Sequence, residues 1–237
     1  SAAMDTALRV LGILPRIDWV ALVFFCAAWA GYAIFARHHG RRQSLLETTN
    51  RVRRQWMLQT TYRDPRVVDG MIIQNLSTSP SFFASTTILI IGGLLAVFGA
   101  ADKAHDIARE LPFAARTTEL VFDFKLMFLL GVFIYAFFRF TWSMRQYTFG
   151  ALLIAAAPDA QRFLDEGLSR DEFADKAGRI VGMAADTFND GLRAYYFSFA
   201  VAGWFFSPYV FLVASAGVVW ILYQREFHSD VLAVLTS

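Results

Sequence analysis

Four long apolar runs constrain what this chain can fold into more than any other feature of its sequence. One of them, from Ser81 to Ala101, has 21 residues without a charge. At roughly 1.5 Å per residue it would form a helix of about 30 Å, which is the thickness of the hydrocarbon core of a bilayer. The sequence therefore predicts a protein that crosses a membrane.

The composition of the chain agrees with this prediction. Hydrophobic residues make up 56% of the chain and charged residues only 18%, whereas a soluble globular protein has about 25% charged residues. The formal net charge is +2, from 22 basic and 20 acidic residues, so the chain lacks the basic excess of a nucleic-acid-binding protein. We expect its main partner to be the lipid bilayer and expect no nucleic acid to bind.

We interpret the chain as all-α, an integral membrane four-helix bundle with cytoplasmic amphipathic helices, forming a single membrane domain over residues 1–237. In the third apolar run we expect Lys125 and Arg139 to extend towards opposite membrane surfaces. The last run has 30 residues and contains Pro208. We expect one tilted helix with a kink at Pro208 instead of a re-entrant hairpin, because each half is too short to cross and no Gly or Asn marks a turn. The expected spans are residues 17–36, 81–101, 122–142 and 194–223.

The basic residues predict how the chain is threaded. Residues 37–80 hold eight Lys or Arg and residues 143–193 hold six, against two before the first span, three in residues 102–121 and one near the C-terminus. Basic residues favour the cytoplasmic side of a membrane. We therefore expect both longer loops in the cytoplasm and both termini outside.

Both cytoplasmic loops are predicted to be helical. Ser169 and Glu172 fit a capping box at the start of a helix, and apolar residues follow at helical spacing towards the last span. Asp64 and Pro65 fit the start of another helix, which leads into the second span. We expect the two loops to pack on each other; the alternative is that they bind anionic lipid or a partner subunit. The basic residues considered for anionic lipid are Arg41, Arg42, Arg51, Arg53 and Arg54.

Residues that would carry enzyme chemistry are sparse. The four His residues and the single Cys26 have no metal-ligand spacing, and there is no phosphate-binding glycine loop or nucleophile motif. The cores of the predicted spans lack Asp and Glu, which ion-coupled transporters generally place at mid-depth. We expect no catalytic residues, no metal and no cofactor, so the protein is not predicted to be an enzyme.

The second span has one face of small and hydroxylated residues. Such a face can line a narrow pore when several copies of a helix meet, but it serves more commonly as a seam where helices pack closely. The residues of this face are Ser81, Ser85, Gly92, Ala96 and Gly99.

A resemblance to a known family rests on the run from Phe82 to Leu89, which reads Phe-Phe-Ala-Ser-Thr-Thr-Ile-Leu. Trp56-Met57, Asp64 and Gln74-Asn75-Leu76 precede this run. Together these residues resemble the domain of unknown function 599 family of bacterial and plant integral membrane proteins, over roughly residues 18–223. The resemblance implies a multi-span protein of the bacterial inner membrane and brings no established activity.

Two hypotheses for function follow from these patterns. The first is a homo-oligomeric ion channel or pore lined by the second span, which the small hydroxylated face favours. The alternative is a non-conducting membrane scaffold or regulator that acts through its basic cytoplasmic helical layer. We rank the channel first by a narrow margin, because four spans exceed what an anchor requires.

The predicted threading can be tested by cysteine labelling. In a Cys26→Ala background, a single cysteine at Gln161 should be protected from an impermeant thiol reagent in intact cells, whereas one at Ala104 should be labelled. Labelling at Gln161 in intact cells would show that the orientation is reversed.

Overall fold

The computed structural model describes residues 2–38, 43–112 and 119–237. These residues are helical apart from short connections, which confirms the predicted all-α fold class. Among the described residues, four segments are long and apolar enough to cross a membrane: α2, α4, α6 and the stretch of 29 residues that contains α9 and α10. The described helices are α1 (Ala2–Leu11), α2 (Arg16–His38), α3 (Leu45–Thr60), α4 (Val67–Gly99), α5 (Ala101–Glu110), α6 (Glu119–Ala156), α7 (Ala160–Asp165), α8 (Arg170–Trp204), α9 (Pro208–Phe227) and α10 (Asp230–Thr236).

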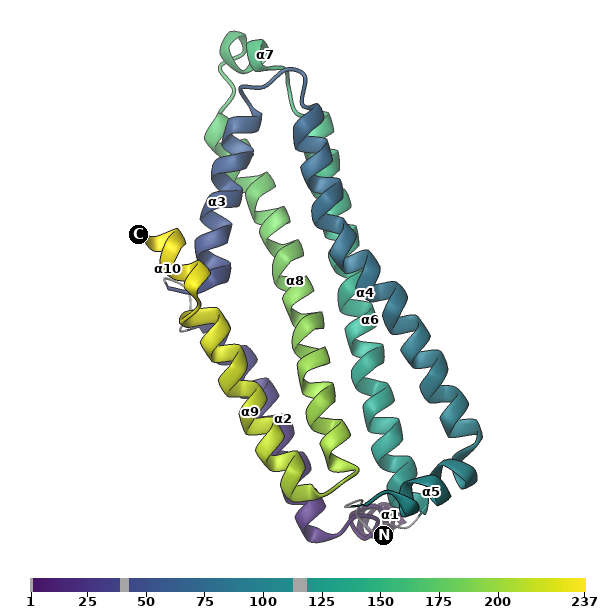
Figure 1. Ribbon diagram of the computed structural model, residues 1–237. Helices are drawn as coiled ribbons and strands as arrows, with labels where there is room; N and C mark the ends of the chain where they lie inside the picture. Colours follow the sequence, from purple (N-terminus) through teal and green to yellow (C-terminus); the bar gives the residue numbers. More distant parts are fainter. Residues whose placement is uncertain (1, 39–42, 113–118) are drawn as a thin grey trace.

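The helices are arranged around α8, with α6 and α4 on one side and α9 and α2 on the other (Figure 1). Helices α4, α6 and α8 have 33, 38 and 35 residues, so each is roughly 50 Å long or more and exceeds a membrane core of about 30 Å. They continue into a second layer together with α3 and α7. We call α3, α7 and the adjoining ends of α4, α6 and α8 the polar layer, and the rest of the bundle the membrane layer.

The membrane layer is held together by a cluster of aromatic side chains. Phe25 of α2, Phe197 and Trp204 of α8, and Phe211 of α9 are fully buried. The rings of Trp204 and Phe211 stack with centroids 4.9 Å apart, and Phe25 lies 5.0 Å from Phe211. Aromatic pairs at such distances stabilise packing beyond the area they bury. One cluster therefore joins α2, α8 and α9.

The prediction of one kinked helix over residues 194–223 is wrong, because the chain reverses direction between α8 and α9. Helix α8 ends at Trp204, and Ser207 has an extended backbone and caps α9 by accepting a hydrogen bond from the Tyr209 N–H at 3.1 Å. Pro208 is the first residue of α9 and not a kink, a position where its missing N–H costs nothing. Neither half is too short, because α8 starts at Arg170 and α9 has 20 residues.

The expectation that both termini lie on the same side of the membrane is also wrong. The Trp204 indole N–H bonds Asp18 near the start of α2, and Phe35 contacts Phe227 where α2 and α9 end. Helices α2 and α9 therefore run in the same direction, and the N- and C-termini lie at opposite ends of the membrane layer (Figure 1). The reason is that the second half of α8 forms an additional helical segment in the core of this layer, which the Asp and Arg residues of α8 had concealed.

The polar layer confirms that the two loops form helices that pack on each other. Ser169 caps α8 by accepting from the Glu172 N–H at 3.2 Å, as the capping box predicts. Helix α3 crosses α8 closely at Gly178, where an added Cβ would lie 3.0 Å from the Arg54 Cα atom. The predicted start of a helix at Asp64 and Pro65 is wrong, since α4 begins at Val67.

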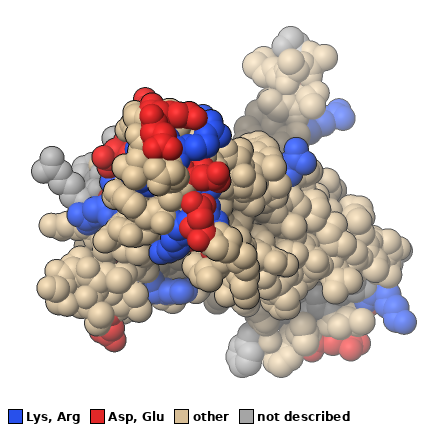
Figure 2. Space-filling view, turned by 90° about the horizontal axis from the view of Figure 1, so that it is seen from above, with Lys and Arg blue, Asp and Glu red and all other residues tan. Residues whose placement is uncertain are grey.

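Acidic and basic side chains are mixed on one part of the end formed by the polar layer, and other residues cover much of the rest (Figure 2). The predicted apolar stripe at the start of α4 is only partly buried. Ile73 packs into the core of this layer, whereas Val67, Val68 and Met71 are exposed. The polar layer thus leaves apolar side chains uncovered at its edge.

The close contact between α6 and α8 requires a residue without a side chain at Gly191, and this requirement can be tested. A Cβ at this position would lie 2.5 Å from the ring of Phe140, which is fully buried and stacks on Phe83. We expect Gly191→Ala to lower the free energy of unfolding by about 1–3 kcal/mol, measured by denaturation in detergent micelles. Gly131→Ala is the matched control, because nothing lies within 4 Å of its added Cβ; equal losses would contradict the assigned contact.

Candidate functional site

A cluster of charged residues joins three helices where the membrane layer meets the polar layer. Asp190 of α8 accepts a hydrogen bond from Arg193 at 3.1 Å and lies 3.7 Å from the guanidinium groups of both Arg37 and Arg139. The side chains of Asp190 and Arg193 are buried. Arg193 also lies over the ring of Tyr32, 5.6 Å from its centroid. The cluster ties α2, α6 and α8 together with several Arg groups around one carboxylate.

Two polar hollows flank this cluster and share Leu46, Arg193 and Glu226 as walls. The first, the α2–α3 hollow, has a volume of about 740 Å³ and lies between the end of α2, α3 and α8. The second, the α4–α9 hollow, has a volume of about 620 Å³ and is lined from α3, α4, α8 and α9. Both hollows are large enough to hold a small polar ligand or a lipid headgroup.

The charged residues of the two hollows differ. Arg54 lines the α2–α3 hollow, but it pairs with Asp171 and Asp175, and these hydrogen bonds raise the pKa of its guanidinium. Arg53 lines the α4–α9 hollow and donates to two neutral acceptors, Thr49 Oγ1 and Asn50 Oδ1, each at 2.9 Å. Burial lowers the pKa of the Arg53 guanidinium. The Arg that α3 presents to the α4–α9 hollow is therefore bonded to neutral oxygens, whereas Arg54 in the α2–α3 hollow is paired with acids.

A second ion pair lies at the opposite end of the membrane layer. Lys125 Nζ is 3.9 Å from Asp18 Oδ1 and donates to the backbone carbonyl of Trp204 at 3.1 Å. The Trp204 indole N–H donates to the same Asp18 oxygen at 2.7 Å. Lys125 is 1% exposed, so the expectation that it extends towards the membrane surface is wrong. It is buried because α2 and α8 supply acceptors inside the bundle.

Asp123 falls within the bounds predicted for the third span, and its Oδ1 atom is buried without a hydrogen-bond partner among the described residues. It lies two residues before Lys125, near the N-terminal end of α6, where the chain enters the membrane layer. An acidic residue at this boundary can be tolerated where one at mid-depth could not.

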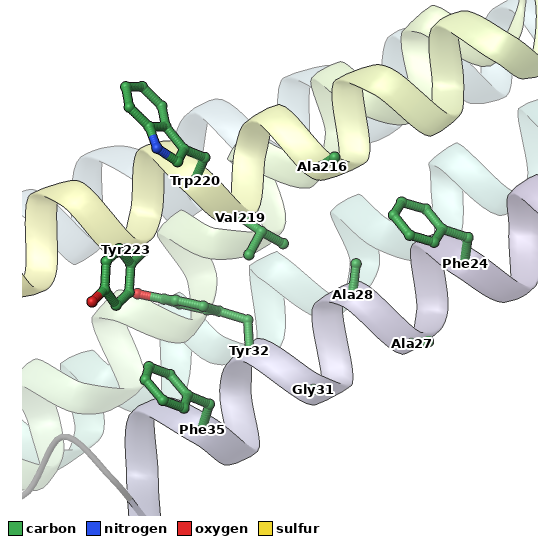
Figure 3. A pocket seen from close by; sticks show the side chains of 10 residues that line it. All are labelled: Phe24, Ala27, Ala28, Gly31, Tyr32, Phe35, Ala216, Val219, Trp220 and Tyr223. Carbon is green, nitrogen blue, oxygen red and sulfur yellow. The ribbon is translucent and has the colours of Figure 1, made fainter.

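A third hollow, the apolar hollow, lies between α2 and α9 within the membrane layer (Figure 3). Its volume is about 550 Å³. The ring of Tyr32 points from α2 towards Tyr223 of α9, which places the two phenol groups together at one end of the hollow (Figure 3). Its lining residues carry no charge, so it suits a hydrocarbon chain. Its lining residues are Phe24, Ala27, Ala28, Gly31, Tyr32, Phe35, Ala216, Val219, Trp220 and Tyr223.

The small residues predicted on the second span share one face of α4, and this face points away from the bundle. Ser85, Gly92, Ala96 and Gly99 are exposed, and Ser81 is half-buried on the flank of the face. An added Cβ at Gly92 or Gly99 would meet nothing within 4 Å. The inward face of α4 instead carries Thr87, whose hydroxyl bonds Tyr195 of α8. The small face therefore lines no space within one chain.

The basic residues predicted to bind anionic lipid lie in different places. Arg41 and Arg42 lie outside the described residues. Arg51 is exposed and lines the α2–α3 hollow with Arg54, whereas Arg53 faces the α4–α9 hollow. Within the described residues, no group of three His, Cys, Asp or Glu could hold a metal ion.

The Asp190 cluster was not predicted, because residues 143–193 were assigned to a cytoplasmic helical loop outside the membrane bundle. One local signal existed: Asp190 and Arg193 are three residues apart, the spacing that brings side chains together on a helix. Arg37 and Arg139 come from distant parts of the chain, so their approach to Asp190 could not be read from spacing.

Fold and site together define a multi-pass, all-helical membrane protein with charged clusters at both ends of its membrane layer. The chain belongs to the family described as "Protein of unknown function, DUF599", which matches residues 20–231. This confirms the resemblance found in the sequence. No curated protein and no solved structure matches the chain.

The Asp190 cluster predicts a large effect of one substitution. Asp190→Asn leaves Arg193 buried without its carboxylate, and breaking such a pair costs about 3 kcal/mol of folding free energy. Denaturation in detergent micelles should show this loss, and Asp190→Glu should restore part of it. Glu166→Gln, which removes an acid from an exposed pair with Arg162, should leave stability unchanged; equal effects would contradict the cluster's role.

Proposed function

We propose that this protein is a homo-oligomeric scaffold of the bacterial inner membrane, assembled through the outer face of α4. The observation that carries the proposal is the position of α4 at the edge of the bundle. It packs along α6, and Phe83 and Thr87 reach α8. Its opposite face is exposed along the whole helix.

The outer face of α4 is apolar in both layers. In the membrane layer Phe82 and Leu89 are 64% and 76% exposed, and lipid could cover them. In the polar layer Val67 and Met71 are 63% and 65% exposed. Val67 is about 24 Å along the helix from Phe83, and Phe83 stacks on Phe140, next to Arg139 of the charged cluster. Lipid does not extend so far, so these side chains need a protein partner.

A second copy of the chain is the partner that fits both parts of this face. Small residues at Gly92 and Ala96 would allow two α4 helices to approach closely in lipid, and the apolar residues near Val67 would meet in the polar layer. The excess of basic residues in the polar layer supports its placement in the cytoplasm, with the N-terminus outside. The oligomer would then hold a rigid helical platform at the inner membrane surface.

A conducting pore is the second candidate, favoured by the residues that share the outer face of α4. Ser85 lies near the polar layer, and Leu89, Gly92 and Ala96 follow towards the other end of the helix. If copies of α4 surrounded a central axis with this face inward, Ser85 hydroxyls could replace part of an ion's hydration. Leu89 would form an apolar constriction that closes by dewetting.

Assembly can be tested with two matched substitutions at exposed alanines. Ala96→Leu on α4 should reduce the mass of the particle in detergent, measured by light scattering, because the larger side chain separates the helices. Ala27→Leu on α2 adds the same atoms at another exposed site and should leave the mass unchanged. A monomeric native protein, or equal effects of both substitutions, would overturn the proposal.

Ion flux into liposomes separates the two candidates. A pore predicts salt-driven flux that Ser85→Phe blocks and Leu89→Ser increases, while the oligomer persists. A scaffold predicts an oligomer without flux under any of the ions and pH values applied.

A further inference from the structure

The α4–α9 hollow lies at the height of a lipid headgroup. At the end nearest the membrane layer, its wall includes Leu192 and Leu222. Arg193 of the charged cluster also lines the hollow. From there it extends into the polar layer as far as Arg53 and Tyr147. The headgroup region of a bilayer occupies several Å beyond each surface of the hydrocarbon core. The hollow therefore starts where the hydrocarbon ends.

The hollow is lined by helices that flank α8 from opposite sides. Helix α4 packs on α6, and α9 packs on α8, α2 and α3, with α8 between the two groups (Figure 1). Asn75 and Ser79 of α4 face the hollow from one side, and Arg225 of α9 from the other. A ligand could thus enter laterally from the membrane, between α4 and α9.

Positive charge converges on this hollow from three helices. Arg53 comes from α3, Arg193 from α8 and Arg225 from α9. The acidic residue that lines it, Glu226, already accepts a hydrogen bond from the Leu46 N–H at 3.0 Å. Asp190 already pairs with Arg193, so the charges of Arg53 and Arg225 against that of Glu226 leave an excess of one positive charge, which favours an anion.

Two of these Arg groups lack an acidic partner. Within the described residues, neither Arg53 nor Arg225 forms an ion pair. Arg225 lies over the ring of Tyr196, 5.3 Å from its centroid, and Arg53 bonds neutral oxygens. Arg presents a planar fork of donors that matches phosphate oxygens. The unpaired groups are those that a bound phosphate would neutralise.

We propose that the α4–α9 hollow binds the phosphate group of one anionic phospholipid from the leaflet next to the polar layer, between Arg53, Arg193 and Arg225. The apolar wall at the end nearest the membrane layer would receive the first part of the acyl chains, which a soluble phosphate ester lacks. Basic pockets between membrane helices are known to hold such headgroups. The proposal is independent of assembly, because none of these Arg residues lies on α4.

The test is lipid titration followed by native mass spectrometry of the full chain in detergent. We expect phosphatidylglycerol to bind at least about fivefold more tightly than phosphatidylcholine with the same acyl chains. Arg53→Gln and Arg225→Gln should each weaken phosphatidylglycerol binding by about fivefold, the effect of one basic residue near an anionic lipid. Arg53→Lys, which keeps the charge, should retain most of the binding.

Arg51→Gln is the matched control, because Arg51 lies on the same helix but lines the α2–α3 hollow. It should leave phosphatidylglycerol binding unchanged, with the same helical content and oligomeric mass in all variants. Should Arg53→Gln fail to fold, Arg225→Gln carries the test, because its side chain is exposed. The proposal is overturned if phosphatidylglycerol has no advantage, if Arg51→Gln weakens binding as much as Arg53→Gln, or if glycerol phosphate competes as well as the lipid.

Discussion

The pairing of Asp190 with Arg193 on α8 is the interaction on which the rest of the membrane layer depends. A helix that carries two charges at the edge of the hydrocarbon cannot face lipid there, because ionised groups in lipid cost several kcal/mol or more unless they are paired. The other helices of the layer satisfy this requirement. Arg37 and Arg139 approach Asp190 from α2 and α6, and α9 covers the remaining side. The position of α8 at the centre of the bundle follows from its charges.

The charged residues at both ends also fix the thickness of the layer. Asp18 and Arg37 stand at the two ends of α2, about 28 Å apart along the helix, close to the thickness of a bilayer core. Asp18 bonds Trp204 and pairs with Lys125, while Arg37 pairs with Asp190. The polar contacts thus bracket an interior of aromatic rings. Each charged cluster fixes the position of one helix along its neighbours. Packing of Phe side chains alone would allow these helices to slide past one another.

The parts of the fold that were predictable from the sequence depend on local patterns. The apolar runs marked three spans, and the capping box at Ser169 marked the start of α8. The hairpin at Ser207 was missed because a proline was taken as a kink, although a serine before it forms an N-cap. The periodicity also placed Ser85, Gly92 and Ala96 on one face. It could not show that this face points outward, since that depends on which side of α4 meets α6.

The different bonding partners of the Arg residues explain why a basic loop does not by itself define a lipid-binding site. Arg66 donates to the Ala157 and Pro158 carbonyls, and Arg170 bonds the carbonyls of Thr61 and Ala160, so both close the tip of the polar layer. Arg54 is neutralised by acids of α8. Counting basic residues treats all these groups as equal, but each occupied guanidinium has lost most of its attraction for an added anion. Arg53 and Arg225 differ from these residues, because both face the α4–α9 hollow and neither is paired with an acid among the described residues.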